Sequence, residues 1–142
     1  MGALYRRHPR ILLVEDNLAD VRLTVEALRE AGEEVTVEVA RDGQEAMARL
    51  LRADLPLPDL VLLDLNLPRK SGHEVLREIR ESERLGRIPV VILSTSAAPE
   101  DVERAYAAHA NSYIVKPVDL HEFFRIIKVM CDYWFVVSAL PE

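Results

Sequence analysis

Five short apolar runs alternate along this chain with segments of helical hydrophobic spacing, and this alternation limits the folds open to it. Some of the runs, such as Ile11–Val14 and Leu60–Leu63, are apolar throughout, which is typical of strands buried on both faces. Strands that alternate with helices form βαβ units in which the strands are parallel. The pattern therefore predicts an α/β fold with a doubly wound five-stranded parallel sheet. The other three runs are residues 35–39, 90–93 and 113–115.

The gaps between these runs carry apolar residues at helical spacing, so a helix is expected in each of them. Gly32 is placed to end the first of these helices. A fifth helix is expected to open at Asp119, with Glu122 as the acid of a capping box. The first four helical patterns fall near residues 21–28, 46–51, 75–79 and 99–108.

The composition narrows the classes of function. The chain has 142 residues, of which 49% are hydrophobic and 30% charged, so it suits one compact domain. No apolar run approaches the length of a membrane span, and no secretion signal is recognisable at the N-terminus. The net charge is −6 without a Lys/Arg cluster, so we expect no nucleic-acid partner. The single cysteine, Cys131, fits a reducing cytoplasm, which is the expected location.

Chemistry is expected at one edge of the sheet, because ligands of open α/β sheets bind at the carboxyl ends of the strands. Three carboxylates at one edge repel one another unless a cation neutralises them, and Mg²⁺ prefers oxygen ligands. The edge therefore predicts a Mg²⁺ site beside a carboxylate that can take up a phosphoryl group, with a cation and a hydroxyl to contact its oxygens. The strand-end residues are Glu15, Asp16, Asp64, Ser94, Thr95 and Lys116.

Several short motifs follow one another in a fixed order: Leu12–Asn17, Asp42–Gly43, Leu62–Pro68, Gly72, Pro89–Ser94 and Tyr113–Pro117. With these motifs the chain resembles the response-regulator receiver family over nearly its whole length. The resemblance implies a flavodoxin-like sheet with the strand order 2-1-3-4-5. We expect the receiver domain over residues 10–131, after an N-terminal edge segment over residues 1–9.

The resemblance also implies a role for each site residue. Asp64 would be the phosphoacceptor. The metal ligands would be Glu15, Asp16, Asp64 and the backbone carbonyl of Asn66. The phosphoryl-binding and switch residues would be Ser94, Thr95, Lys116 and Tyr113.

Two residues depart from the commoner family pattern. Glu15 replaces the commoner Asp, which adds a methylene and should keep metal binding. Thr95 stands where many family members have Ala or Gly, so access to the phosphoryl group is expected to be tighter. The peptide bond between Lys116 and Pro117 is expected to be cis.

The implied function is that of a single-domain response regulator, phosphorylated by a sensor histidine kinase and signalling through protein contacts. We expect slow self-dephosphorylation and no other enzyme activity. One alternative is a pseudo-receiver that only binds partners, which the intact acidic residues and Lys116 disfavour. Another is a Mg²⁺-dependent aspartyl phosphohydrolase, which usually has an acid/base Asp where this chain has Asn66.

The C-terminal segment is more apolar than a lone small domain can cover. An extended C-terminal helix from Asp119 to about Ser138 would be about 30 Å long. Because exposed apolar patches mark interfaces, we predict that residues 132–142 form an extension that contacts a second copy in a homodimer. Alternatively, the tail folds back over its own domain. The expected contact residues are Phe124, Trp134, Phe135, Val137 and Leu140.

The end of the chain carries a further resemblance. Asp132–Phe135 followed by Leu140–Pro141 is similar to the ending of stand-alone regulators partnered with bacterial phytochrome histidine kinases. The partner kinase is therefore expected to be a phytochrome.

Overall fold

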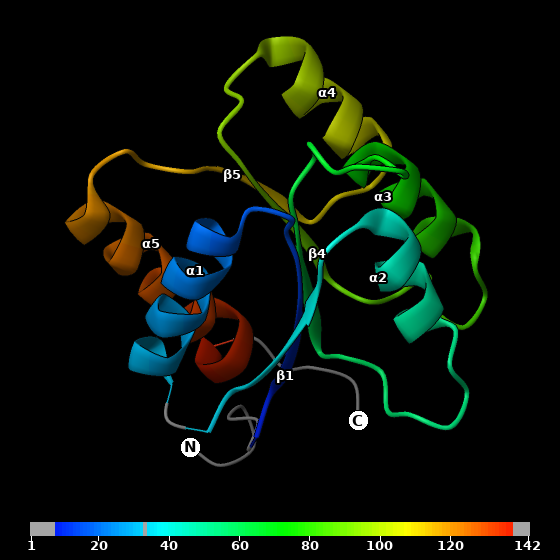
Figure 1. Ribbon diagram of the computed structural model, residues 1–142, viewed down its shortest axis with the longest axis horizontal. Coiled ribbons are helices and arrows are strands. Elements are labelled where there is room, and N and C mark those ends of the chain that lie inside the picture. Colours follow the sequence, from blue (N-terminus) through cyan, green and yellow to red (C-terminus); the bar gives the residue numbers. More distant parts are fainter. Residues whose placement is uncertain (1–7, 33, 138–142) are drawn as a thin grey trace.

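A five-stranded parallel sheet forms the centre of the computed structural model, with helices on both of its faces (Figure 1). The structure describes residues 8–32 and 34–137. The strand order is β2-β1-β3-β4-β5, so the predicted doubly wound sheet and its order are confirmed. The strands are β1 (Arg10–Val14), β2 (Thr36–Ala40), β3 (Leu60–Leu63), β4 (Val90–Ser94) and β5 (Ser112–Val115).

Two helix layers enclose the sheet. Helices α1 and α5 pack together on one face, and α2, α3 and α4 cover the other (Figure 1). In the described part of the chain, none of the helices has the length and apolar character that a bilayer span requires. The helices are α1 (Leu18–Ala31), α2 (Gly43–Leu50), α3 (Gly72–Glu81), α4 (Pro99–Ala107) and α5 (Leu120–Asp132), followed by a π-helical turn η1 (Tyr133–Val137).

The wholly apolar runs are buried because successive side chains of a strand point to opposite faces of the sheet. In β1, Leu12 and Val14 join the core cluster beneath α2, α3 and α4. Ile11 and Leu13 join the second cluster beneath α1 and α5. A run without polar residues therefore serves both cores at once, as the sequence predicted.

The helix ends follow local hydrogen-bonding chemistry. The backbone N–H of Gly32 donates to the Leu28 carbonyl and ends α1, as predicted, although the glycine backbone is extended. The predicted capping box at the start of α5 is wrong. Asp119 accepts a hydrogen bond from the His121 N–H, but Glu122 pairs with Arg125 one turn further along and does not reach back.

A capping box forms instead at α3. Ser71 accepts a hydrogen bond from the Glu74 N–H, and the Glu74 side chain accepts one from the Ser71 N–H. Both partners are satisfied within the first turn, which fixes where α3 begins. This matters for function because α3 starts directly behind the end of β3.

The C-terminal helix extends past Asp132 as predicted, but part of its extension folds back on its own domain. Phe135 is 4% exposed and packs in the core cluster beneath α1 and α5, together with Ile127 and Met130. The prediction that Phe135 contacts a second copy is corrected, because its side chain is already covered within one chain. Leu140 and the side chain of Val137 lie outside the described residues. The predicted boundaries at residues 9/10 and 131/132 stay predictions.

Gly72 lets α3 approach the end of β3. Its N–H donates to the Leu65 carbonyl at 3.0 Å, and a Cβ added to it would lie 2.6 Å from Leu65 Cα and still closer to the Asp64 carbonyl oxygen. Both obstacles are backbone atoms of the loop that carries Asp64. Neither can move without displacing that carboxylate.

We therefore expect Gly72→Ala to lower the free energy of unfolding by about 2 to 3 kcal/mol, because overpacking against backbone cannot relax cheaply. Urea unfolding followed by circular dichroism measures this. Gly32→Ala is the matched control, because its added Cβ would meet only the end of the Val35 side chain. Equal losses in the two variants would contradict this account of Gly72.

Candidate functional site

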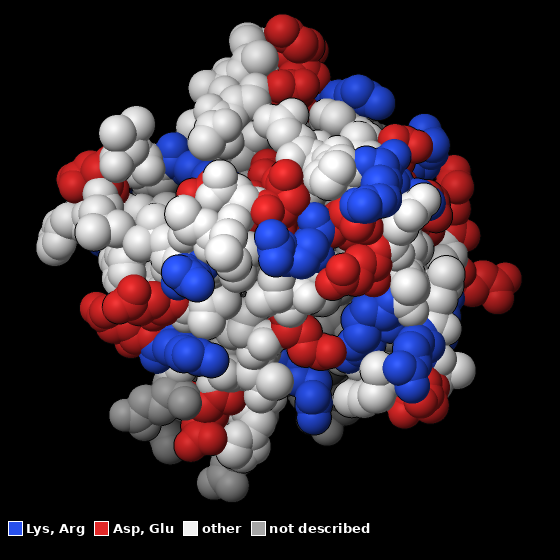
Figure 2. All heavy atoms as spheres, viewed as in Figure 1, with Lys and Arg blue, Asp and Glu red and all other residues white. Residues whose placement is uncertain are grey.

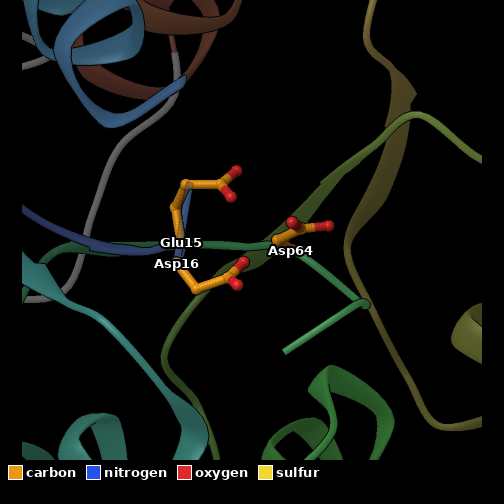
Figure 3. Close-up of side chains that lie close together, drawn as sticks. All are labelled: Glu15, Asp16 and Asp64. Atoms are coloured by element: carbon orange, nitrogen blue, oxygen red, sulfur yellow. The ribbon is translucent and has the colours of Figure 1, made fainter. Parts of the chain in front are cut away.

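Three carboxylates meet at the carboxyl end of the sheet. Glu15 and Asp16 follow β1, and Asp64 follows β3, the strand beside it. Figure 3 shows the Glu15 and Asp16 carboxylates extending on the side where Asp64 lies. One oxygen of each residue lies within 4.8 Å of the others. The sheet therefore brings together the three acids that the sequence predicted as one cluster.

Strand pairing holds the cluster in place. The Asp64 N–H donates to the Val14 carbonyl at 3.0 Å, and the Glu15 N–H donates to the Ala40 carbonyl at the same distance. The acids therefore sit on the last rungs of the β-ladder, with little freedom to move apart. Glu15 is 2% exposed and Asp64 is 9% exposed, whereas Asp16 is exposed.

Lys116, which follows β5, reaches across the end of β4 into this cluster. Its Nζ lies 2.6 Å from Glu15 Oε1 and 3.9 Å from Asp64 Oδ2. Its own N–H donates to the Ser94 carbonyl at 2.8 Å, so the backbone at the base of the side chain is fixed. The lysine side chain is 9% exposed, so its ammonium group has replaced hydration with carboxylate contacts.

A fourth acid takes part that the sequence reasoning missed. Asp20, in the first turn of α1, places Oδ2 3.6 Å from Lys116 Nζ. It follows Asp16 by four residues, but that spacing puts two side chains on one face only when both lie in a helix, and Asp16 precedes α1. No sequence signal therefore pointed to Asp20.

The crowding of charge changes the acidity of these groups. Burial, and then the negative charge of Glu15, raise the pKa of Asp64 to about 6, while Lys116 acts in the opposite direction. Burial by itself lowers the pKa of Lys116, but the hydrogen bond to Glu15 and the charge of Asp64 outweigh this and raise it. Asp64 is thus mostly ionised at neutral pH, and Lys116 is fully charged.

The hydroxyl residues lie at the end of β4. Ser94 is fully buried, and its Oγ accepts a hydrogen bond from the Ser96 N–H at 3.1 Å. Tyr113 is not in the acidic cluster; its hydroxyl donates to the Ser96 carbonyl at 2.8 Å. Thr95 is exposed and lines a hollow of about 160 Å³ together with Lys116. Ser94 and Tyr113 are therefore linked through one residue, Ser96.

Two further expectations concern the backbone. The Asn66 N–H donates to Asp64 Oδ1 at 3.4 Å and the residue is exposed, so Asn66 lies at the cluster. The role of its carbonyl as a metal ligand stays a prediction. The peptide bond between Lys116 and Pro117 is trans, so the expected cis bond is wrong.

The comparison with protein families decides what this arrangement belongs to. Residues 11–128 match the family described as the response regulator receiver domain. The chain belongs to this family. Receiver domains bind a divalent metal ion at an acidic pocket, and the cluster of Glu15, Asp16 and Asp64 fits such an ion: three oxygen donors converge with more negative charge than Lys116 neutralises.

Several relatives match this receiver domain along most of its length. The response regulator Rcp1 of Synechocystis is 42% identical over 135 residues, which cover 92% of each chain. The probable methanogenesis regulatory protein FilR2 of Methanothrix harundinacea is 44% identical, over 92% of this chain and 86% of that protein.

Two solved structures of response regulators share the fold. The phosphorylated cyanobacterial phytochrome response regulator RcpA superposes with a TM-score of 0.90 at 47% identity, over 95% of this chain and 99% of that chain. The Mn²⁺-bound form of Rcp1 superposes with a TM-score of 0.88 at 41% identity, over 94% and 99%. The resemblance to regulators of phytochromes is therefore confirmed.

Replacing Asp64 tests the electrostatic description. Because the pKa of Asp64 is raised, its contribution to stability is present below about pH 4 and is lost as the pH rises through about 6. At pH 7 without divalent metal, Asp64→Asn should therefore raise the free energy of unfolding by about 1 to 2 kcal/mol, after allowance for partial solvent screening.

Thermal unfolding in the presence of a chelator, at pH 7 and at pH 4, measures this effect. The gain should shrink at pH 4, where Asp64 is largely protonated. Asp54→Asn is a control for removal of an exposed carboxylate. A loss of stability in Asp64→Asn at pH 7 would contradict this description, because it would show that burial and the charge of Glu15 do not destabilise the ionised Asp64 carboxylate.

Proposed function

We propose that this chain is a phosphoacceptor switch in which Asp64 takes a phosphoryl group from a sensor histidine kinase with the help of Mg²⁺. The observation that carries the proposal is the contact set of Lys116, whose ammonium group reaches Glu15 and Asp64 at once. An acid pair, a nucleophilic carboxylate and a neighbouring cation are the groups that this transfer needs. Receiver-family membership supports the same reading.

Each residue has a task in the transfer. An Asp64 carboxylate oxygen forms the new O–P bond while the N–P bond of the kinase phosphohistidine breaks, and the leaving nitrogen keeps the electron pair. Lys116 moves from Glu15 toward a phosphoryl oxygen. The Ser94 hydroxyl donates to another of these oxygens. Glu15, Asp16 and the Asn66 carbonyl would hold the Mg²⁺, which when bound supplies positive charge to the phosphoryl oxygens.

Other features limit what the site does. Thr95 is exposed and lines a hollow together with Lys116, so we propose that it narrows the approach of water or of a phosphatase group to the phosphoryl group. Asn66 stands where a phosphohydrolase would have its acid/base Asp, so we propose only slow self-dephosphorylation. This function places the chain in the cytoplasm with its kinase. On the face shown in Figure 2, acidic and basic side chains are interspersed and do not form a basic patch. We therefore propose that this face does not bind nucleic acid.

The partner kinase is proposed to be a bacterial phytochrome. The match to the cyanobacterial phytochrome response regulator RcpA, over 95% of this chain and 99% of that chain, supports this choice. Phosphotransfer from a phytochrome kinase should then be faster than transfer from an unrelated kinase.

Incubation with acetyl phosphate and Mg²⁺ tests the phosphoacceptor directly. Intact-mass spectrometry should show one added phosphoryl group, which a chelator or the Asp64→Asn substitution abolishes. Asp59→Asn is the matched control. Asp59 directly precedes β3, whereas Asp64 directly follows it, so this substitution should leave labelling unchanged. Labelling that survives in Asp64→Asn would rule out Asp64 as the acceptor.

We further propose a homodimer built on the outer face of α5. Val129 and Tyr133 are 55% and 54% exposed, and Val129 also borders a groove between α1 and α5 that Phe124 lines. Trp134 packs edge-on against Tyr133. The helix carries acids and bases along the same face, such as Asp132 and Lys128, so two antiparallel copies can match opposite charges.

Sedimentation equilibrium at micromolar concentration should therefore show a dimer. Val129→Glu places a charge in the contact and should raise the dissociation constant of the dimer at least about tenfold, which is the effect expected from the loss of one desolvated apolar contact. Leu51→Glu is the matched control, because Leu51 is equally apolar and 61% exposed at the end of α2. A monomer in the unsubstituted chain would contradict the proposal.

A further inference from the structure

Helix α4 is held in place more by hydrogen bonds than by packing. Ala105 is its one buried residue. The Tyr106 hydroxyl, in the last turn, accepts a hydrogen bond from the Tyr113 N–H at 3.1 Å. At the other end the N-cap residue is Ala98, which offers no side-chain cap. The position of this helix therefore depends on a few polar contacts.

Ser96 links the N-cap residue to the first turn of α4 by a relay. The Ala98 N–H donates to Ser96 Oγ at 3.2 Å, and the Ser96 hydroxyl donates to Asp101 Oδ2 at 2.5 Å. In an ordinary capping box the acid in the first turn would accept from the N-cap directly. Here Asp101 holds the start of α4 through Ser96.

The same serine is tied to both proposed switch residues. Its N–H donates to Ser94 Oγ, and its carbonyl accepts from the Tyr113 hydroxyl. A displacement of the Ser94 hydroxyl toward a phosphoryl group on Asp64 therefore pulls on Ser96. Any such pull acts on the bond between Ser96 and Asp101.

A second partner for Asp101 lies nearby and is unsatisfied. The His73 side chain, at the start of α3, is 10% exposed, and neither of its ring nitrogens has a hydrogen-bond partner. Its Nε2 lies 3.8 Å from Asp101 Oδ1, about 1 Å too far for a hydrogen bond. A buried imidazole left unpaired is costly, so a shift that closes this gap is favourable.

We propose that Asp101 exchanges hydrogen-bond partners when phosphorylation of Asp64 draws the Ser94 hydroxyl toward the phosphoryl group: the carboxylate turns so that its Oδ2 loses the Ser96 hydroxyl and its Oδ1 closes on His73 Nε2. His73 and Asp101 are then positioning residues of the switch: they couple the end of β4 to the start of α4 and draw that end of α4 toward α3. The inference rests on the proposed function and assigns a role to two residues outside the acidic cluster.

The ionisation of His73 reports this exchange. Two charged groups of α4 face the imidazole, Asp101 and Arg104. At the present distance burial, and then the charge of Arg104, lower the pKa of His73, and Asp101 only partly offsets them. A direct bond to the Asp101 carboxylate favours the imidazolium, so the midpoint of the His73 titration should rise by about 1 pH unit.

The experiment is a ¹⁵N NMR titration of the histidine side chains in the full chain, with His73→Gln to assign the signal. The titration is run on the free protein and on protein holding Mg²⁺ and beryllium fluoride, a stable stand-in for the phosphoryl group. The His73 midpoint should rise with the stand-in and should not rise in Asp101→Asn. An unchanged midpoint in protein that acetyl phosphate labels at Asp64 overturns the exchange and leaves the phosphoacceptor intact.

Ser96→Ala tests the exchange without phosphorylation. Removing the hydroxyl releases Asp101 Oδ2, which lets the carboxylate turn its Oδ1 toward His73, so the His73 midpoint should rise already in the free protein. Ser82→Ala is the matched control, because Ser82 caps a turn after α3 and does not touch Asp101. If Ser96→Ala leaves the midpoint where it was, Asp101 does not turn to His73 and the proposal fails, whether or not Asp64 is phosphorylated.

Discussion

The contact between Lys116 and the acids at the end of β1 and β3 is the interaction on which the rest of the site depends. The Lys116 ammonium group lies 2.6 Å from Glu15 Oε1 and within 4 Å of both Asp64 and Asp20. One positive charge faces several carboxylates that the β-ladder prevents from separating. Burial, and then the negative charge of Glu15, raise the pKa of Asp64, and the excess of negative charge in the cluster favours binding of a divalent cation.

The topology explains why these groups can be supplied by so short a chain. Because β1 and β3 pair in parallel, Glu15 and Asp64 lie next to each other at the carboxyl end of the sheet, although they are far apart in the sequence. The lysine comes from β5, two strands away, and spans β4 with its long side chain. Gly72 brings the start of α3 against the same loop, which joins the acidic site to His73 and, through α4, to Asp101.

Much of this could be predicted from the sequence, because buried parallel strands are apolar without interruption and the strand-end rule then selects the acids and Lys116. What depended on side-chain geometry could not. Glu122 has the right spacing for a capping box, yet Arg125 takes its carboxylate. Phe135 has the apolarity of an interface residue, yet the turn of η1 buries it in its own domain. The relay from Ser96 to Asp101 matches no known capping pattern in the sequence, because the N-cap residue of α4 is an alanine and the serine lies two residues before it.

The most direct test of the account is calorimetric titration of Mg²⁺ into the unsubstituted protein and into Lys116→Met, which keeps the length of the side chain and removes its charge. If Lys116 balances the excess charge of the acids, its removal should strengthen Mg²⁺ binding by about tenfold, in line with one lost like charge near the site. Binding that is unchanged or weaker in Lys116→Met would contradict the account, because the acids would then not need the lysine to offset their repulsion.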